Sequence, residues 1–214
     1  MTAPLLLWFR DDLRLADHPA LRAALDKDAP IIPVYLHTPE AEGNWPRGGA
    51  SRWWLHHALA DLNKQLKAKG STLILRSGPH PSPLLEKLME ETGAQEIHWN
   101  RRYDPRHVEI DTGLKKKFPA VSHRGSMLFE PGQVMTQSNT PYQVFTPYYR
   151  AMQKQGAPPQ PLPTPREIPS PSSLPSSEKL EDWDLLPDIP WDEQFPEHWD
   201  PTENGAAQQL DLFL

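Results

Sequence analysis

Residues 5–21 read LLLWFRDDLRLADHPAL, and this stretch decides the fold. An apolar run at residues 5–9 ends in the charged segment 10–14, and residues 17–19 then provide the start of a helix. A short apolar run that stops at a cluster of charges is typical of a buried parallel strand that ends at a cleft. In open α/β sheets, ligands bind outside the carboxyl ends of the strands. The opening residues therefore predict both a fold class and the location of a site.

The same alternation continues through the first 156 residues. Strands are expected at residues 5–9, 31–37, 72–75, 96–99 and near Val121, and the intervening helices at residues 19–25, 51–69, 82–92 and 105–118. The second of these helices has a buried face of leucines at three- and four-residue spacing, Leu55, Leu59, Leu62 and Leu66. In the last helix, the residues expected to face inward are Val108, Leu114 and Phe118. Alternating strands and helices predict an α/β fold with a five-stranded, doubly wound parallel sheet of the Rossmann-like kind.

Composition divides the chain into differently built regions. The net charge is −6, but residues 1–156 hold 20 Lys and Arg against 16 Asp and Glu, whereas residues 157–214 hold 2 against 12. Twelve of the 26 prolines fall between Pro158 and Pro201, and proline is incompatible with helix interiors and central strands. We expect an α/β domain at residues 1–156, a long proline-rich, acidic connector at residues 157–201, and the start of a helical domain at residues 202–214.

The connector also contains three tryptophans, Trp183, Trp191 and Trp199. Large aromatic side chains bury much apolar area and are unusual in a free linker. We therefore expect the connector to be extended over a surface, with these tryptophans docked on it.

Several function classes are excluded by what the sequence lacks. There is no cysteine, which excludes disulfides, thiol catalysis and thiolate metal sites and suits a cytoplasmic protein. The mean hydropathy is −0.65, and no apolar run approaches the roughly 18 residues of a membrane span. No glycine follows the first strand, so the usual dinucleotide- and phosphate-binding loops are missing. The histidines are scattered, and the adjacent His56 and His57 have poor geometry for a shared metal, so no metal site is expected.

Three sequence blocks occur in the order and spacing of a known family. The first is WFRDDLRLADHPAL at residues 8–21, the second is RGGASRWWL at residues 47–55, and the third is PYQVFTPYYR at residues 141–150. The first resembles the pattern W-F-R-x-D-L-R-L-x-D-N-P-A-L of DNA photolyases and cryptochromes, and the third resembles their P-Y-x-V-F-T-P-F-x-R-A. The resemblance covers residues 4–155, the connector is similar to the family's interdomain linker, and residues 205–214 look like the first helix of its second domain.

This resemblance implies the N-terminal part of a light-driven DNA repair photolyase, a carbon–carbon lyase that splits cyclobutane pyrimidine dimers. In the family, a large helical domain holds FAD and receives the flipped-out dimer of damaged DNA, and light-excited reduced flavin passes an electron to the dimer. That domain would follow the present residues. No catalytic residue is therefore assigned to this chain, and the chain alone is expected to be inactive. The full-length protein is expected to be a cytoplasmic monomer without membrane contact.

Two other functions are compatible with the same residues. A cryptochrome-type blue-light photosensor differs mainly in the helical domain, and its output is a protein interaction rather than repair. A free-standing pigment-binding module would need only the α/β domain, but the sequence stops at Leu214 inside what looks like a helix.

The resemblance also implies a light-harvesting antenna pigment housed in, or facing, the α/β domain at the carboxyl ends of the strands. The expected cofactor-binding residues are Arg10, Leu36, His37, Asn100, Arg102, Arg106 and His107. Their aromatic and guanidinium groups suit a planar, anionic pigment. The alternative to pigment binding by the charged residues of segment 10–14 is that they form a structural ion-pair cluster. The alternative for Asn100 and Arg102 is that they cap a helix and carry solvated charge.

The pigment itself is left open. Folate-carrying relatives place an Asn-Glu pair where this chain has Arg106 and His107. Methenyltetrahydrofolate held differently, a deazaflavin, a flavin or no pigment all remain compatible with the sequence. The lysines at 115–117 are interpreted as a complement to a helix dipole rather than as a DNA site.

Overall fold

The computed structural model describes residues 2–214, and its centre is one parallel sheet. The five strands are β1 (Leu5–Phe9), β2 (Ile31–His37), β3 (Ile74–Ser77), β4 (Glu96–Asn100) and β5 (Ala120–His123), in the order β3-β2-β1-β4-β5. In β1, Leu5 lies beside Ile31 of β2 on one side and beside Glu96 of β4 on the other. The predicted five-stranded, doubly wound α/β fold is confirmed.

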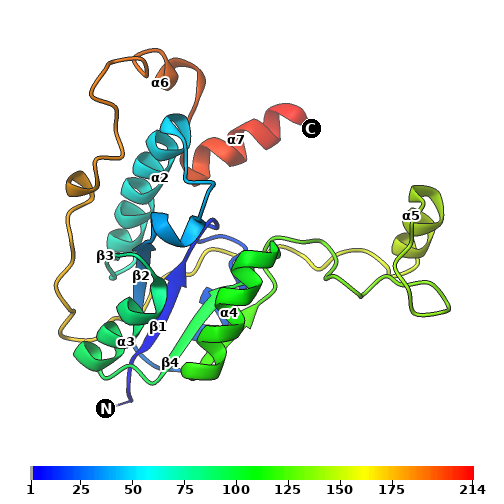
Figure 1. Cartoon of the computed structure of the whole chain (residues 1–214), viewed down its shortest axis with the longest axis horizontal. Helices are drawn as coiled ribbons and strands as arrows, with labels where there is room; N and C mark the ends of the chain where they lie inside the picture. Colours follow the sequence, from blue (N-terminus) through cyan, green and yellow to red (C-terminus); the bar gives the residue numbers. More distant parts are fainter. Residues whose placement is uncertain (1) are drawn as a thin grey trace.

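Helices cover both faces of this sheet (Figure 1). On one face, α1 (Pro19–Leu25) and α2 (Gly49–Ala68) pack against Leu7 and Phe9. On the other, α3 (Pro81–Thr92) and α4 (Pro105–Lys117) pack against Leu6 and Trp8. Successive side chains of a strand point to opposite faces, so the apolar run of β1 is buried from both sides. Each fully buried large apolar side chain of this kind contributes about 1.5–3 kcal/mol.

Two local expectations are wrong. Strand β3 begins at Ile74 rather than residue 72, because the preceding residues close the end of α2: the Leu73 N–H donates to Asn63 Oδ1 (3.1 Å). In α4, Val108 is half-exposed rather than buried. The inward side of that helix runs through Asp111 and Leu114, which turns Val108 outward.

The connector runs along the α/β domain and hydrogen-bonds to it. The N–H groups of Asp17 and Ile31 donate to the carbonyls of Leu162 and Pro169, both at 2.7 Å. Further on, the Glu178 N–H donates to the Leu75 carbonyl at 3.1 Å. This last contact covers the free edge of β3, which would otherwise offer unpaired backbone groups to another strand.

The three connector tryptophans differ in how they dock. Trp183, in the 3₁₀ helix η2 (Leu180–Trp183), packs against the core, as expected. Trp191 is 44% exposed and Trp199 is 57% exposed, although Trp199 makes an edge-to-face contact with Trp54 of α2. Docking is therefore firm at Trp183 and partial at the other two positions.

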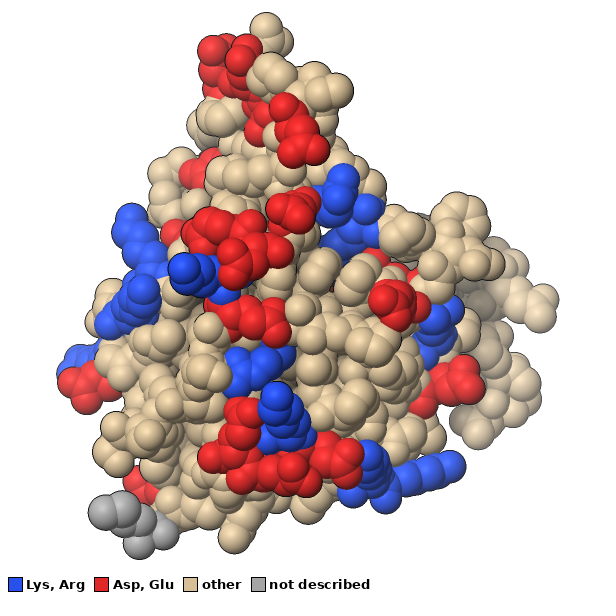
Figure 2. All heavy atoms as spheres, turned by 60° about the vertical axis from the view of Figure 1, so that its left-hand side comes forward, with Lys and Arg blue, Asp and Glu red and all other residues tan. Residues whose placement is uncertain are grey.

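The C-terminal part of the chain lies beside α2. Helix α6 (Phe195–His198) lies near the end of the connector, helix α7 (Glu203–Phe213) follows it, and α7 is attached to the loop after β1. The Glu203 carboxylate accepts hydrogen bonds from the N–H groups of Leu15 and Ala16, both at 2.8 Å. Figure 2 shows carboxylates crowding the upper end of this face, where the region of α6 lies.

Helix α5 (Phe145–Gln153) belongs to a different part of the molecule. It lies on an arm, residues 131–160, that projects away from the sheet (Figure 1). The short 3₁₀ helix η1 (Pro39–Glu42) follows β2. Among residues 2–214, no helix combines the length and apolar character needed to cross a membrane.

Candidate functional site

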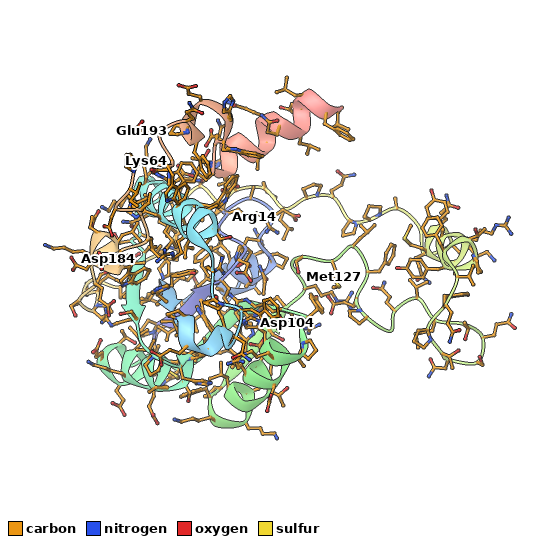
Figure 3. All side chains as sticks on the ribbon, turned by 45° about the horizontal axis from the view of Figure 1, so that its top comes forward. Arg14, Lys64, Asp104, Met127, Asp184 and Glu193 are labelled. Carbon is orange, nitrogen blue, oxygen red and sulfur yellow. The ribbon has the colours of Figure 1, made fainter. Side chains whose placement is uncertain are left out.

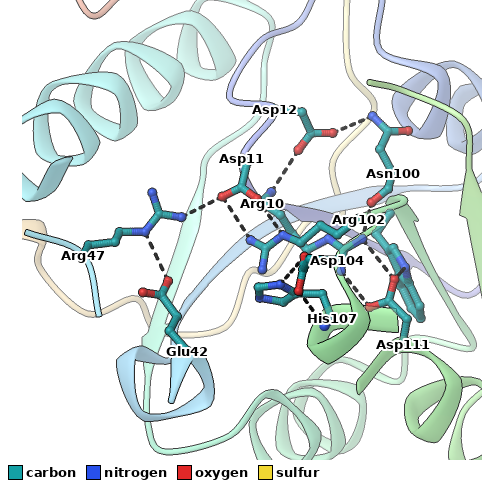
Figure 4. A network of polar contacts seen from close by, with 11 residues as sticks. Arg10, Asp11, Asp12, Glu42, Arg47, Asn100, Arg102, Asp104, His107 and Asp111 are labelled. Carbon is teal, nitrogen blue, oxygen red and sulfur yellow. Dashed lines mark hydrogen bonds and ion pairs between the residues drawn. The ribbon is translucent and has the colours of Figure 1, made fainter. Parts of the chain in front are cut away.

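Polar side chains converge at the carboxyl ends of β1, β2 and β4 (Figure 4). Residues Arg10, Asp11 and Asp12 follow β1, and Asn100 and Arg102 come from the end of β4. Because β1 and β4 are neighbours whose crossovers leave toward opposite faces, this edge is the switch point where α/β folds bind ligands.

Arg10 is the most buried cation of this edge. Its guanidinium lies 2.7 and 3.2 Å from the two carboxylate oxygens of Asp111, and it also donates to the Asn100 carbonyl. It lies 5.0 Å from the ring of Trp8 and 5.8 Å from that of Trp99, within the range of cation–π contact. Burial lowers the pKa of Arg10, and the neighbouring Asp111 acts in the opposite direction. The pair is thus a buried, bidentate ion pair between β1 and α4.

A second group of charges lies nearer the surface. Asp11 bridges two arginines, with 2.6 Å to Arg47 Nη2 and 2.7 Å to Arg102 Nε. Arg47 also lies 3.2 Å from Glu42 of η1. Burial lowers the pKa of Arg47, but Tyr35 and these carboxylates outweigh it, so the pKa is raised overall. Because Asp11 is half-exposed, each of these pairs contributes at most about 1 kcal/mol.

Asn100 and Asp12 face α1. The Ala20 N–H donates to Asn100 Oδ1 (3.0 Å), the Asn100 amide donates to Asp12 Oδ2 (2.5 Å), and His18 Nε2 lies 3.1 Å from the same oxygen. Burial acts to raise the pKa of Asp12, but the hydrogen bonds from His18, Asn100 and the Arg10 N–H hold it well below its usual range. The oxygen of Asn100 therefore accepts a backbone N–H from the first turn of α1, while its amide group holds Asp12.

The candidate pigment residues do not line one cleft. Five of them border a small cavity beside Trp8 and Tyr35, namely Arg10, Leu36, His37, Arg102 and His107. Its volume is about 20 Å³, which is room for about one water. Burial raises the pKa of Tyr35 to about 12 and lowers the pKa of His37.

Two larger hollows adjoin this cavity. The first, about 320 Å³, is lined by Arg10, Asn100, Arg102 and the neighbouring loop residues, including Arg14, Tyr103 and Gly125. The second, about 650 Å³, lies between α3 and α4 and is lined by Arg106. Only Arg10 and Arg102 border both the small cavity and the 320 Å³ hollow.

Arg106 holds the loop after β2. Its guanidinium donates to the carbonyls of Ala41 and Glu40 and lies against Gly43. Gly43 has φ +66°, and a Cβ there would lie 2.0 Å from Arg106 Nη1. The backbone conformation therefore favours glycine, and a Cβ would in addition displace the Arg106 guanidinium.

Several residues of this site were missed from sequence. Asp111 is the most important of them. A sequence signal for it was present, because this acidic residue lies three positions before Leu114, on the inward side of α4. Tyr35, Glu42 and Arg47 were missed as well, because nothing local indicates that their side chains meet the charges after β1.

Comparison with known proteins identifies the family. The DNA photolyase family model matches residues 5–166. This chain belongs to the DNA photolyase family. It is 43% identical over its whole length to a deoxyribodipyrimidine photo-lyase of Agrobacterium fabrum, of which it covers 45%. A crystal structure of a bacterial class III photolyase from Agrobacterium tumefaciens superposes with a TM-score of 0.91 and 42% identity, covering 99% of this chain and 44% of that one.

Cryptochromes of the same family match a smaller part. Cryptochrome-2 of Arabidopsis thaliana is 35% identical over 150 residues, which is 68% of this chain and 24% of the relative. The chain thus spans less than half the length of these relatives. The family predicted from the three sequence blocks is confirmed.

Proposed function

We propose that this chain is the N-terminal part of a light-driven photolyase that repairs cyclobutane pyrimidine dimers in DNA. The observation that carries the proposal is the 43% identity to a deoxyribodipyrimidine photo-lyase across all of the chain, whereas the cryptochrome match covers 68% of it at 35%. The domain division at residues 156 and 201 is part of the proposal. The family resemblance implies that FAD and the damaged base are held by the part of the relatives that this chain does not span, so no catalytic residue is assigned here.

We further propose that the 320 Å³ hollow holds a light-harvesting pigment, such as methenyltetrahydrofolate or a deazaflavin. Its volume lies within the about 300–1,000 Å³ of small-molecule sites. The buried Nε of Arg10, which borders it, has no hydrogen-bond partner among residues 2–214, so an acceptor on a ligand would satisfy it. When bound, the pigment would supply absorbed light energy to the flavin.

The candidate residues take different parts in this proposal. Arg10, Asn100 and Arg102 would contact the pigment directly, because all three border the hollow. Leu36, His37 and His107 would form the wall behind Arg102, since the cavity they line is too small for a ring system. Arg106 would act indirectly, through the loop that it holds.

The repair proposal is tested with the full-length gene product. Purified, flavin-loaded protein is illuminated with an oligonucleotide that contains a thymine dimer, and the recovery of absorbance at 260 nm is followed. Light-dependent recovery is expected. A flavin-loaded protein that leaves the dimer intact would instead favour the cryptochrome-type photosensor.

The pigment proposal is tested separately on the 214-residue chain. The chain is incubated with each candidate pigment, and occupancy is read from the absorption spectrum after gel filtration. Arg102→Ala should lower occupancy severalfold, whereas Arg22→Ala, which removes an exposed cation of α1, should leave it unchanged. Equal occupancy in wild type and Arg102→Ala would remove Arg102 from the site.

We also propose that the full-length protein is cytoplasmic and monomeric. Cell fractionation tests its location, and light scattering tests its oligomeric state.

A further inference from the structure

One arginine at the 320 Å³ hollow differs from its neighbours in lacking a counter-charge. Three of the arginines that border the hollow form ion pairs at 2.7 Å, namely Arg10 with Asp111, Arg101 with Glu130, and Arg102 with Asp11. Arg14 also borders the hollow, and it forms no ion pair among residues 2–214. Its positive charge therefore favours an anionic group of a ligand in this hollow.

The guanidinium of Arg14 uses only part of its donor capacity within the chain. Its Nε donates to the Ala16 carbonyl at 3.1 Å, and its Nη2 donates to the carbonyls of Asp17 (2.8 Å) and Gly125 (3.0 Å). A guanidinium carries five N–H groups, and these bonds account for the ones on Nε and Nη2. The two on Nη1 have no partner among residues 2–214, so they are available to a carboxylate or phosphate oxygen.

Arg14 also holds the arm at the place where it leaves the α/β domain. Two segments join the arm to the domain, a first root at residues 124–130 and a second root at residues 161–166. The Gly125 carbonyl that Arg14 binds belongs to the first root, and Gly125 and Ser126 themselves border the hollow. Figure 3 shows Arg14 on the side of the domain from which the arm projects. The first root is therefore part of the wall of the hollow.

The second root is held by the same loop after β1. The Asp17 N–H donates to the Leu162 carbonyl at 2.7 Å, and Asp17 Oδ1 accepts the Leu162 N–H at 3.1 Å. Asp17 has φ +48°, a left-handed conformation. Because Arg14 binds the carbonyl of Asp17 as well as that of Gly125, one guanidinium connects the hollow with both roots of the arm.

We propose that Arg14 binds an anionic group of the ligand in the hollow, and that this contact fixes the orientation of the arm. That the ligand is a pigment rests on the proposed function. Ordering a long arginine side chain costs conformational entropy. A ligand that binds Nη1 already orders the guanidinium, so the bonds from Nη2 to Asp17 and Gly125 then form at a smaller further cost. Coupling is reciprocal, and a firmly held arm therefore favours ligand binding.

The first test measures binding of methenyltetrahydrofolate, whose glutamate tail carries carboxylates, to the 214-residue chain by equilibrium dialysis. Arg14→Gln removes the charge and should weaken binding at least about tenfold. The control is Arg52→Gln on α2, which removes an exposed cation that does not border the hollow and should change binding less than about twofold. Equal binding by Arg14→Gln and wild type would overturn the proposal.

The second test loosens the arm without changing a residue of the hollow. Asp17 does not border the hollow, and glycine accepts its left-handed backbone, so Asp17→Gly removes only the acceptor of the Leu162 N–H. This variant should weaken methenyltetrahydrofolate binding about threefold. Asp17→Asn keeps an acceptor oxygen and tolerates the same conformation, so it should bind like wild type. Wild-type affinity in Asp17→Gly would contradict the coupling.

The third test observes the arm directly. Because the chain has no cysteine, Lys154→Cys beside α5 and Lys64→Cys on α2 provide two unique positions for nitroxide labels (Figure 3). Pulsed electron paramagnetic resonance then measures the distribution of the distance between the labels. Saturating methenyltetrahydrofolate should roughly halve the width of this distribution in the labelled chain and leave it unchanged when Arg14→Gln is added. A width that the pigment does not change in either chain would refute the coupling.

The outcomes separate this inference from the pigment proposal. Pigment occupancy that Arg102→Ala lowers and Arg14→Gln leaves unchanged would refute this inference alone. No occupancy of the wild-type chain would refute the pigment proposal and, with it, the coupling to the arm.

Discussion

The indole of Trp183 lies face to face with the imidazole of His37, with ring centroids 4.9 Å apart and planes 22° apart. One ring belongs to the connector and the other to the end of β2, where it borders the small cavity. The indole N–H is held by Glu178 at 2.8 Å, and Glu178 also accepts the Ser77 N–H at the end of β3. The connector therefore supports the candidate site from behind, through the ring of His37.

This contact predicts that Trp183→Ala destabilises the domain. The loss of a partly buried aromatic ring and its stacking partner should lower the free energy of unfolding by about 2–3 kcal/mol, somewhat less than for a fully buried ring. Urea denaturation measures this loss of stability, and limited proteolysis should show earlier cleavage in the connector. The control is Trp45→Ala, which removes an indole that is 89% exposed and should change stability by less than about 0.5 kcal/mol. Equal effects would show that Trp183 does not anchor the connector.

The Arg10–Asp111 pair predicts a large penalty when one partner is neutralised. Asp111→Asn keeps the shape but leaves a buried guanidinium without its counter-charge, which should cost about 3–5 kcal/mol. Asp26→Asn, which breaks the exposed pair with Arg22, should cost less than about 0.5 kcal/mol. Both are read from urea unfolding curves. Adding Arg10→Met to Asp111→Asn removes the uncompensated charge and should restore part of the lost stability. A double variant less stable than Asp111→Asn would argue that the buried charge is not the cause of the loss.

Attachment of α7 depends on Glu203. In Glu203→Gln, one carboxylate oxygen is replaced by an amide group that cannot accept, so one of the two N–H groups loses its partner at a cost of about 1–2 kcal/mol. Hydrogen exchange at Leu15 and Ala16 should therefore become about tenfold faster. Glu197→Gln, on exposed α6, serves as the control and should leave these two amides unchanged. Unaltered exchange in Glu203→Gln would mean that other contacts hold α7.

A histidine pair predicts pH dependence. His123 stacks on His98, and burial, followed by the charge of His98, lowers the pKa of His123 from 6.5 to about 4. As the pH falls below 6.5, the unfolded chain takes up a proton that the folded chain refuses, so stability is lost between pH 6.5 and about 4. Allowing for solvent screening of the partly exposed ring, the loss should be about 1–2 kcal/mol.

The measurement is urea unfolding at pH 7 and pH 4.5. His123→Phe keeps an aromatic ring against His98 but cannot titrate, so its stability should depend less on pH than that of wild type. His198→Phe, at an exposed position of α6, should retain the wild-type dependence. A His123→Phe profile parallel to wild type would assign the titration to other groups.

Much of the fold is readable from local sequence. The apolar run of β1 has a strand's length, the leucines of α2 repeat at helical spacing, and Asp104 followed by Pro105 marks the start of α4. Each signal lies within a few residues and reflects the geometry of a single element. Their order along the chain then restricts the topology to a doubly wound sheet.

The candidate site was only partly readable. The sequence placed Arg10 and Arg102 at one edge, because parallel strands end together. It did not reveal that Asp111, 101 positions away, neutralises Arg10, or that Asn100 turns toward α1. Such pairings depend on how α4 and α1 rotate as they pack, which no local pattern records.

By itself, the sequence determined the class of fold and the family, since these depend on residue types and their spacing. Only the tertiary structure decided which charges are paired and how the space at the sheet edge is divided into cavities. The physical reason is that pairing and cavity shape are set by contacts between elements far apart in the chain, whereas periodicity and composition are local.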